Sequence, residues 1–118
     1  MTDKRKPSRD AILALLKAKE GISIAEVTDE NKHLLHDRYV DVIDKCHAGD
    51  LVWNVTPPRG GRPAVAVVLF SLTGTPHAEL FRDGSVLAAG PVVIRDEQWI
   101  LVSTQSRGDF SLLTGAVV

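Results

Sequence analysis

The sequence is poor in the features that stabilise secreted and membrane proteins. It holds one cysteine, Cys46, in 118 residues, so no disulfide can form within the chain and a reducing cytoplasm is the expected compartment. The longest apolar run, residues 64–70, is far shorter than the roughly 20 residues that cross a bilayer as a helix. The first seven residues are charged rather than apolar, so we expect neither a signal peptide nor a membrane segment.

Motifs for catalysis and for metal binding are also missing. No glycine-rich phosphate loop follows a predicted strand, and no carboxylate pair stands in a recognisable catalytic frame. His33, His36, Cys46 and His47 are candidate metal ligands, but one helix cannot bring all four to one ion, and CxxC and HExxH patterns are absent. Cys46 and His47 point in different directions on a helix, so they form no nucleophile–base pair. We expect no enzyme, no cofactor and no metal site, with Cys46 as a small core residue.

The charge is nearly balanced but unevenly distributed. The formal net charge is −1, which by itself argues against a nucleic-acid partner. Lys and Arg nevertheless outnumber Asp and Glu in residues 1–20 and in residues 56–82, whereas residues 21–55 are acidic. Because attraction to phosphates depends on a local basic face rather than on the sum of charges, nucleic acid stays a candidate partner.

The apolar spacing predicts three helices in the first 48 residues. After a basic arm (residues 1–7), the first helix begins at the N-cap Ser8 and ends near Gly21. A short second helix follows the capping-box pattern of residues 23–26. The third helix runs from about His33 to Ala48, and its apolar side is formed by Leu35, Tyr39, Val42, Ile43 and Cys46.

From residue 51 the pattern changes to that of β-structure. Residues 51–55 and 64–72 are rich in β-branched and aromatic residues, and the segment between them, Thr56–Pro63, is rich in Pro, Gly and Arg. This pattern predicts a β-hairpin with a long, stiff, basic tip. A meander of four further short strands is expected at Val86–Ala89, Val92–Arg95, Trp99–Val102 and Phe110–Leu113.

Three fragments of the sequence resemble bacterial winged-helix regulators. Asp37–Val52 resembles their recognition helix and the corner that follows it, in which a Gly closes the helix and a Leu-Val pair opens the strand. Arg59–Ala64 resembles the wing, and Phe70–Gly74 resembles the end of the third strand. The resemblance covers residues 8–75 and implies a winged helix-turn-helix of three helices and a hairpin wing (residues 8–76). Together with the small antiparallel β-meander expected from the strand pattern of residues 77–118, this gives an α+β fold.

The resemblance also implies contacts with double-stranded DNA. The third helix would enter the major groove with residues near its N-terminal end, where Arg38 could bond two acceptors of a guanine. The wing would approach phosphates or the minor groove, and the arm could follow an adjacent groove. The expected DNA-binding residues are Lys4, Arg5, Lys6, Arg9, His36, Arg38, Tyr39, Arg59, Gly60, Gly61 and Arg62.

The expected function is therefore sequence-specific binding of double-stranded DNA, as in a repressor-like transcription regulator of a bacterium or phage. Asp37, Asp41, Asp44 and Asp50 oppose this interpretation, because carboxylates beside phosphates are costly. One alternative is thus a winged helix that docks a protein partner through the acidic face of the third helix. Another alternative is a replication or partition factor that binds DNA.

The last third of the chain has no counterpart in a minimal winged helix. Its expected strands near Val92–Ile94 and Trp99–Val102 are apolar on both faces, so both faces should be covered. A small meander is marginal alone, and a DNA-binding protein with a two-fold operator needs two heads. These arguments favour a homodimer, and an extended sheet that completes one monomeric core is the alternative.

Overall fold

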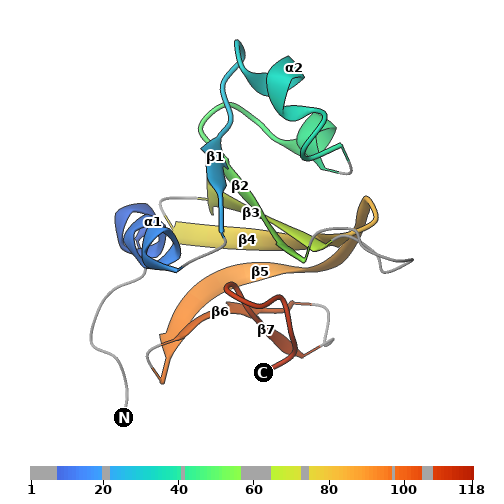
Figure 1. Ribbon diagram of the computed structural model, residues 1–118. Coiled ribbons are helices and arrows are strands. Elements are labelled where there is room, and N and C mark those ends of the chain that lie inside the picture. Colours follow the sequence, from blue (N-terminus) through green and yellow to red (C-terminus); the bar gives the residue numbers. More distant parts are fainter. Residues whose placement is uncertain are drawn as a thin grey trace.

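One antiparallel sheet of seven strands forms most of the protein (Figure 1). The computed structural model describes residues 8–19, 22–40, 42–56, 65–72, 75–96, 98–104 and 108–118. Each strand is hydrogen-bonded to the strands before and after it in the sequence, so the order is β1 to β7. The elements are α1 (Arg9–Ala18), β1 (Ile24–Glu26), α2 (Lys32–Leu35), the 3₁₀ turn η1 (Ile43–Lys45), β2 (Leu51–Thr56), β3 (Val65–Leu72), β4 (Thr75–Arg82), β5 (Ser85–Arg95), β6 (Gln98–Val102) and β7 (Asp109–Ser111).

The expected α+β fold, a winged helix-turn-helix of three helices followed by a small antiparallel β-meander, is wrong, because the described residues form one seven-stranded antiparallel sheet with two α-helices, one of them of four residues. The capping-box residues 23–26 do not start a helix. Ile24–Glu26 form strand β1 instead and pair with Trp53, Val52 and Leu51 of β2. Here pairing with a buried neighbouring strand outweighs a local capping signal, because propensity is a weak preference that tertiary context overrides.

The expected third helix is also wrong, although its apolar side was identified. Only Lys32–Leu35 are α-helical, and the chain continues through single turns to η1. Bonds from Tyr39 N–H to Leu35 O and from Ile43 N–H to Tyr39 O keep the helical spacing locally. The turns therefore place the predicted apolar residues on one side without forming the long rod that a DNA groove would accept.

The first helix agrees with the sequence prediction. Ser8 is its N-cap, and the Ser8 hydroxyl accepts a hydrogen bond from the Ala11 N–H at 3.1 Å. Ile12 and Leu16, one turn apart, are fully buried against the sheet. No helix in the described parts of the chain is long and apolar enough to span a membrane.

The sheet has an apolar cluster on each face. The main core, on the concave face, is formed by α1 and strands β2 to β7 with the turn that follows β7. The second core lies on the other face, where segment 27–46 covers β2, β3 and β4. The main core contains Ile12, Leu16, Leu51, Trp53, Val65, Val67, Leu69, Ala78, Leu80, Ala88, Val92, Trp99, Leu101, Phe110 and Leu112. The second core contains Val27, Tyr39, Val42, Ile43, Cys46, Val52, Ala66, Val68 and Phe81.

Strand β5 bends the sheet back over the main core. Its first half pairs with β4 and its second half with β6, so one strand of 11 residues replaces the two strands expected on either side of Gly90-Pro91. At Gly90 the backbone of the next segment comes very close, since a Cβ atom there would lie 1.9 Å from Val102 O. Only glycine fits this crossing.

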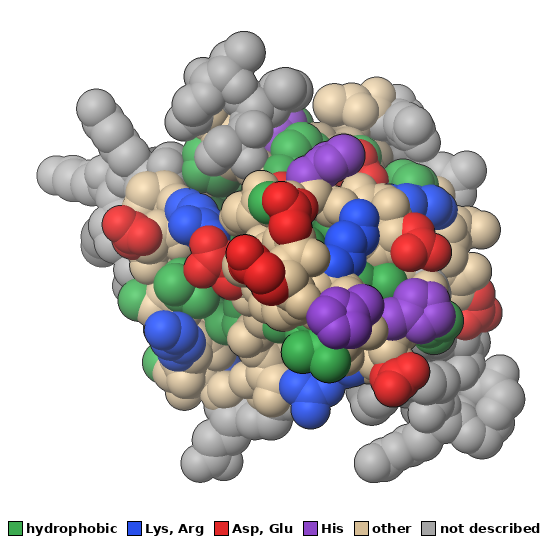
Figure 2. Space-filling model, turned by 90° about the horizontal axis from the view of Figure 1, so that it is seen from above, with side chains coloured by type: hydrophobic (Ala, Val, Ile, Leu, Met, Phe, Trp, Pro, Cys, Tyr) green, Lys and Arg blue, Asp and Glu red, His purple; other side chains and the backbone are tan. Residues whose placement is uncertain are grey.

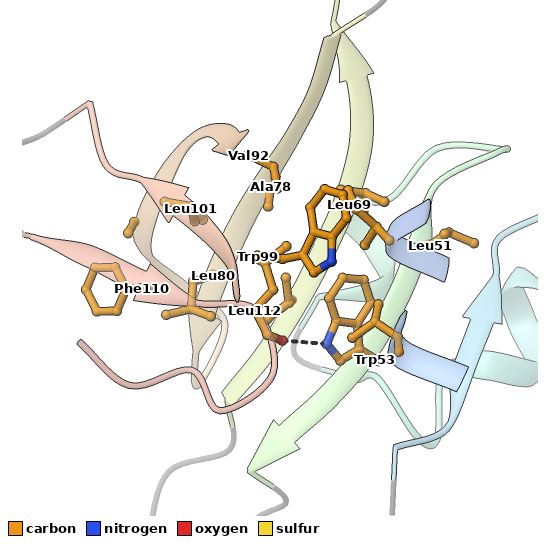
Figure 3. Packing of buried hydrophobic residues seen from close by; sticks show 14 of the residues in the cluster. Leu51, Trp53, Leu69, Ala78, Leu80, Val92, Trp99, Leu101, Phe110 and Leu112 are labelled. Carbon is orange, nitrogen blue, oxygen red and sulfur yellow. Dashed lines mark hydrogen bonds between the residues drawn. The ribbon is translucent and has the colours of Figure 1, made fainter. Parts of the chain in front are cut away.

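The bend brings the end of the chain onto β2. The Trp53 indole N–H donates to Leu112 O at 3.2 Å (Figure 3). The Lys19 ammonium, just after α1, donates to Leu113 O at 2.9 Å. Residues 77–118 therefore share one core with residues 8–76, and β4 runs through the expected boundary between them.

Candidate nucleic-acid interface

In the two hairpins β2–β3 and β4–β5, the strand ends next to the turns lie on the same side of the sheet. We refer to this row of strand ends as an edge of the sheet. Thr56 is the partner of Val65, Val65 is the partner of Arg82, and Arg82 is the partner of Ser85. The turn beyond Arg82 is Asp83-Gly84, with both residues at positive φ, as a two-residue hairpin requires. The exposed Arg82 side chain thus stands beside the strand ends from which the β2–β3 connection leaves.

Arg38 is held at the same edge through its backbone. The Asn54 side-chain amide donates to Arg38 O at 3.4 Å, and Asn54 lies two residues before the end of β2. The Arg38 side chain is exposed. Asn54 Oδ1 is buried without a hydrogen-bond partner among the described residues, so the contact is anchored through the amide nitrogen alone.

Lys45 adds a third cation to this edge. Its ammonium donates to Gly84 O in the β4–β5 turn and lies 5.2 Å from the centre of the Phe81 ring. We call Arg38, Lys45 and Arg82 the basic edge. Their positions come from three different segments, the turns after α2, the 3₁₀ turn η1 and the end of β4.

Most other described cations serve internal contacts. The Arg9 guanidinium donates to Glu26 Oε1 and to Gly49 O, each at 3.0 Å, so this predicted DNA-binding residue joins α1 to β1 and to the turn before β2. Lys32 donates to Cys46 O, and Arg95 pairs with Asp109 at 2.7 Å. These side chains are held by contacts within the fold, and Arg9 and Arg95 are each paired with a carboxylate.

The predicted residues of the third helix are divided between surface and core. His36 is exposed and lines an open hollow of about 450 Å³ together with His33, Lys32 and acidic residues. Seen from above, this face shows acidic, basic and His side chains interspersed (Figure 2). Tyr39 is 1% exposed, and its hydroxyl donates to Ser23 O at 3.2 Å. Burial raises the pKa of Tyr39, and the residue cannot reach a DNA base from this position.

The remaining predicted residues lie outside the described part of the chain: Lys4, Arg5, Lys6, Arg59, Gly60, Gly61 and Arg62. Lys45 and Arg82 were not identified from the sequence. A signal for Arg82 was present, because it precedes the Asp83-Gly84 turn at the end of an alternating stretch in which Ala78 and Leu80 are buried. Lys45 had no such signal, since its position depends on a turn that was expected to be helix.

The described residues form no metal site. No group of three or more His, Cys, Asp or Glu side chains among them is arranged to hold a metal ion. Comparisons of the chain with protein-family models, with characterised proteins and with solved structures found no match.

Proposed function

We propose that the protein binds double-stranded DNA through the basic edge. The observation that carries this proposal is the convergence of Arg38, Lys45 and Arg82 at one edge of the sheet, although they come from three separate segments. Arg38 and Arg82 are exposed and engage no acidic side chain among the described residues. Clustered exposed cations of this kind attract phosphates and release counterions on binding.

Two further cations lie close in the sequence to the strand ends at this edge. Arg59 is three residues from Thr56, and Arg62 is three residues from Val65, and three residues span at most about 10 Å. Both strand ends lie at the basic edge. Arg59 and Arg62 therefore belong to the proposed interface, and the predicted contacts of Lys4, Arg5 and Lys6 stay predictions.

The proposed binding differs from groove reading by a helix. The four residues of α2 and the turns after it give no rod for the major groove. Phosphate contacts position a protein on DNA but carry no sequence information directly. We therefore propose affinity that is dominated by the DNA backbone.

A second candidate function is docking of a protein partner, as the sequence alternative predicted. Leu34 is 70% exposed and Val40 is 59% exposed, and both lie in the segment whose exposed residues include His33, His36 and Asp37. Exposed apolar side chains within a polar rim are typical of protein contacts. Loss of binding to a protein partner on replacing Leu34 and Val40, with DNA binding unchanged, would favour this second function.

Fluorescence anisotropy of labelled duplex DNA at several salt concentrations tests the DNA proposal. We expect a Kd between about 10⁻⁴ and 10⁻⁶ M, the range of backbone-dominated binding, that weakens steeply with salt. The double variant R38A/R82A should bind several-fold more weakly and flatten the salt dependence by about two phosphates.

The matched control is Lys17→Ala, which removes an exposed cation from α1, away from the basic edge. It should leave the salt dependence unchanged. Equal losses of DNA affinity in Lys17→Ala and in R38A/R82A would mean that only net charge matters. No binding of DNA by the unaltered protein would exclude DNA as the partner.

A further inference from the structure

Two adjacent hollows lie where strands β3 and β4 meet the turn 47–50. One, of about 310 Å³, is lined by residues that include Arg9, Gly49, Leu69 and Pro76. The other, of about 360 Å³, lies between the turn 47–50 and the strands. Both are walled by Phe70 and Asp50, so they share one aromatic ring and one carboxylate. Their volumes are those of small-molecule sites.

The floor of the second hollow is apolar and aromatic. It is formed by Val68, Phe70 and Phe81. The Phe70 ring is only half-buried, and it contacts the His77 ring with a centroid distance of 5.8 Å and an angle of 31° between the planes. The ring is therefore partly accessible at the boundary between the hollows.

The rim of the second hollow carries two carboxylates. Asp50 is fixed by the turn, since Asp50 Oδ2 accepts the backbone N–H of His47 at 2.8 Å. Glu79 lies on β4 as the cross-strand partner of Val68, and no hydrogen bond or ion pair joins its carboxylate to another described residue. Both carboxylates act on the nearby buried Cys46, whose pKa they help to raise. The same hollow is also lined by His47 and by Lys45, whose ammonium is bound to Gly84 O over the Phe81 ring, so two carboxylates face one ammonium in this volume.

This floor already accommodates one cation. At its other end the Lys45 ammonium lies over the Phe81 ring, 5.2 Å from the ring centre, and is fixed there by Gly84 O. An ammonium over an aromatic ring is favourable by about 0.5–2 kcal/mol depending on exposure. Phe70, beside Asp50 and Glu79, offers a second ring of the same kind without a cation.

From the shared aromatic wall, the paired carboxylates and the size of the hollows, we propose that this cleft binds a small organic cation, an ammonium group on an apolar body. The ammonium would lie between Asp50 and Glu79, and the apolar body would lie against Phe70. The rim carries two carboxylates against the single ammonium of Lys45, and this excess of negative charge disfavours an anionic ligand of the same shape. The site does not depend on DNA binding.

Isothermal titration calorimetry of the full chain with three probes of similar shape tests this site. The probes are 2-phenylethylammonium, the neutral 2-phenylethanol and the anionic 3-phenylpropanoate. We expect the ammonium to bind with a Kd of about 1 mM or tighter, the alcohol at least about fivefold more weakly, and the carboxylate not measurably. Equal binding of the three probes, or no binding of the ammonium, would overturn the proposal.

Two variants locate the site. Glu79→Gln should weaken the ammonium about fivefold and leave the alcohol unchanged, whereas Phe70→Leu should weaken both probes. Glu30→Gln removes an exposed carboxylate outside these hollows. It should leave the binding of both the ammonium and the alcohol unchanged, and it therefore controls for net charge. Circular dichroism verifies that each variant is folded. Ammonium binding that is equal in all three folded variants would place the probe elsewhere and contradict the assignment.

Discussion

Cys46 is the single thiol of the chain, and it lies fully buried in the second core. Its Sγ is 3.4 Å from Val42 O, to which the thiol can donate a weak hydrogen bond. Burial, together with the negative charges of Asp50 and Glu79, raises the pKa of this thiol from 9.0 to about 11, and Lys32 partly opposes the shift. A thiol in this environment stays protonated and unreactive in the folded protein.

The raised pKa of Cys46 predicts a loss of stability at alkaline pH. Between about pH 9 and pH 11 the unfolded chain releases the thiol proton and the folded chain keeps it, so the free energy of unfolding falls as pH rises. The full effect is roughly 2–3 kcal/mol at most. Urea unfolding of the unaltered protein and of Cys46→Ala at pH 8.5 to 11 measures it, because Tyr39 contributes equally to both.

The variant Cys46→Ala should be less stable than the unaltered protein at pH 8.5, since it leaves a small cavity. The difference in the free energy of unfolding between the unaltered protein and Cys46→Ala should become smaller as pH rises. Parallel curves across this pH range would show that the thiol titrates normally.

Only some of the residues of the proposed DNA interface were predicted from the sequence. Arg38 was identified as the best donor, and it is exposed at the basic edge. Tyr39 was expected both on the apolar side of the third helix and among the DNA-binding residues, and it is a core residue. The apolar spacing thus identified its buried side correctly, whereas its assignment to DNA followed only from its place near the start of the expected helix.

At the scale of elements, strongly patterned segments were predicted well. The helix after Ser8 and the strands near residues 51–56 and 65–72 have the type and place that their apolar spacing indicated. Strand β4 was missed because Pro76 and the polar residues His77 and Glu79 interrupt its apolar character, although Ala78 and Leu80 alternate with them toward the main core. The alternation of apolar and polar residues that is typical of a strand was present there, but the adjacent proline suggested a loop.

Strand β5 supplies a test at this scale. Gly90→Ala places a Cβ in conflict with the backbone carbonyl of Val102, which cannot move aside like the end of a flexible side chain. We expect a loss of about 3 kcal/mol in the free energy of unfolding, the upper part of the range for overpacking. Thermal and urea unfolding measure this loss.

The matched comparison is Gly49→Ala. Gly49 has a φ of +97° and open space where a Cβ would lie, so its substitution costs only the backbone strain, about 1–2 kcal/mol. If Gly90→Ala proved no more costly than Gly49→Ala, strand β5 would not cross the β6 segment as closely as described.

At the scale of the whole molecule, the two tryptophans belong to one core but to opposite sides of the boundary expected at residue 76. Trp53 lies on β2 and Trp99 on β6, and both indoles are fully buried (Figure 3). A small single core unfolds cooperatively. We therefore expect residues 8–76 and 77–118 to unfold together.

Variants with a single tryptophan test this cooperativity. In W99F the fluorescence reports on Trp53, and in W53F it reports on Trp99. Within each variant the urea midpoint from fluorescence should equal the midpoint from far-UV circular dichroism. A fluorescence transition that precedes the circular dichroism transition in either variant would reveal two separately folding parts.

The bond from Trp53 to Leu112 also sets an order of events during protein synthesis. Trp53 leaves the ribosome 59 residues before its hydrogen-bond acceptor does. Until that carbonyl and the last strands emerge, the nascent chain carries a large aromatic side chain and the apolar face of β3 without their covering layer. The meander can pair strand by strand as it is made, but the main core closes only after Leu112 has emerged. This interval is the stage at which the chain is most open to chaperones and to aggregation.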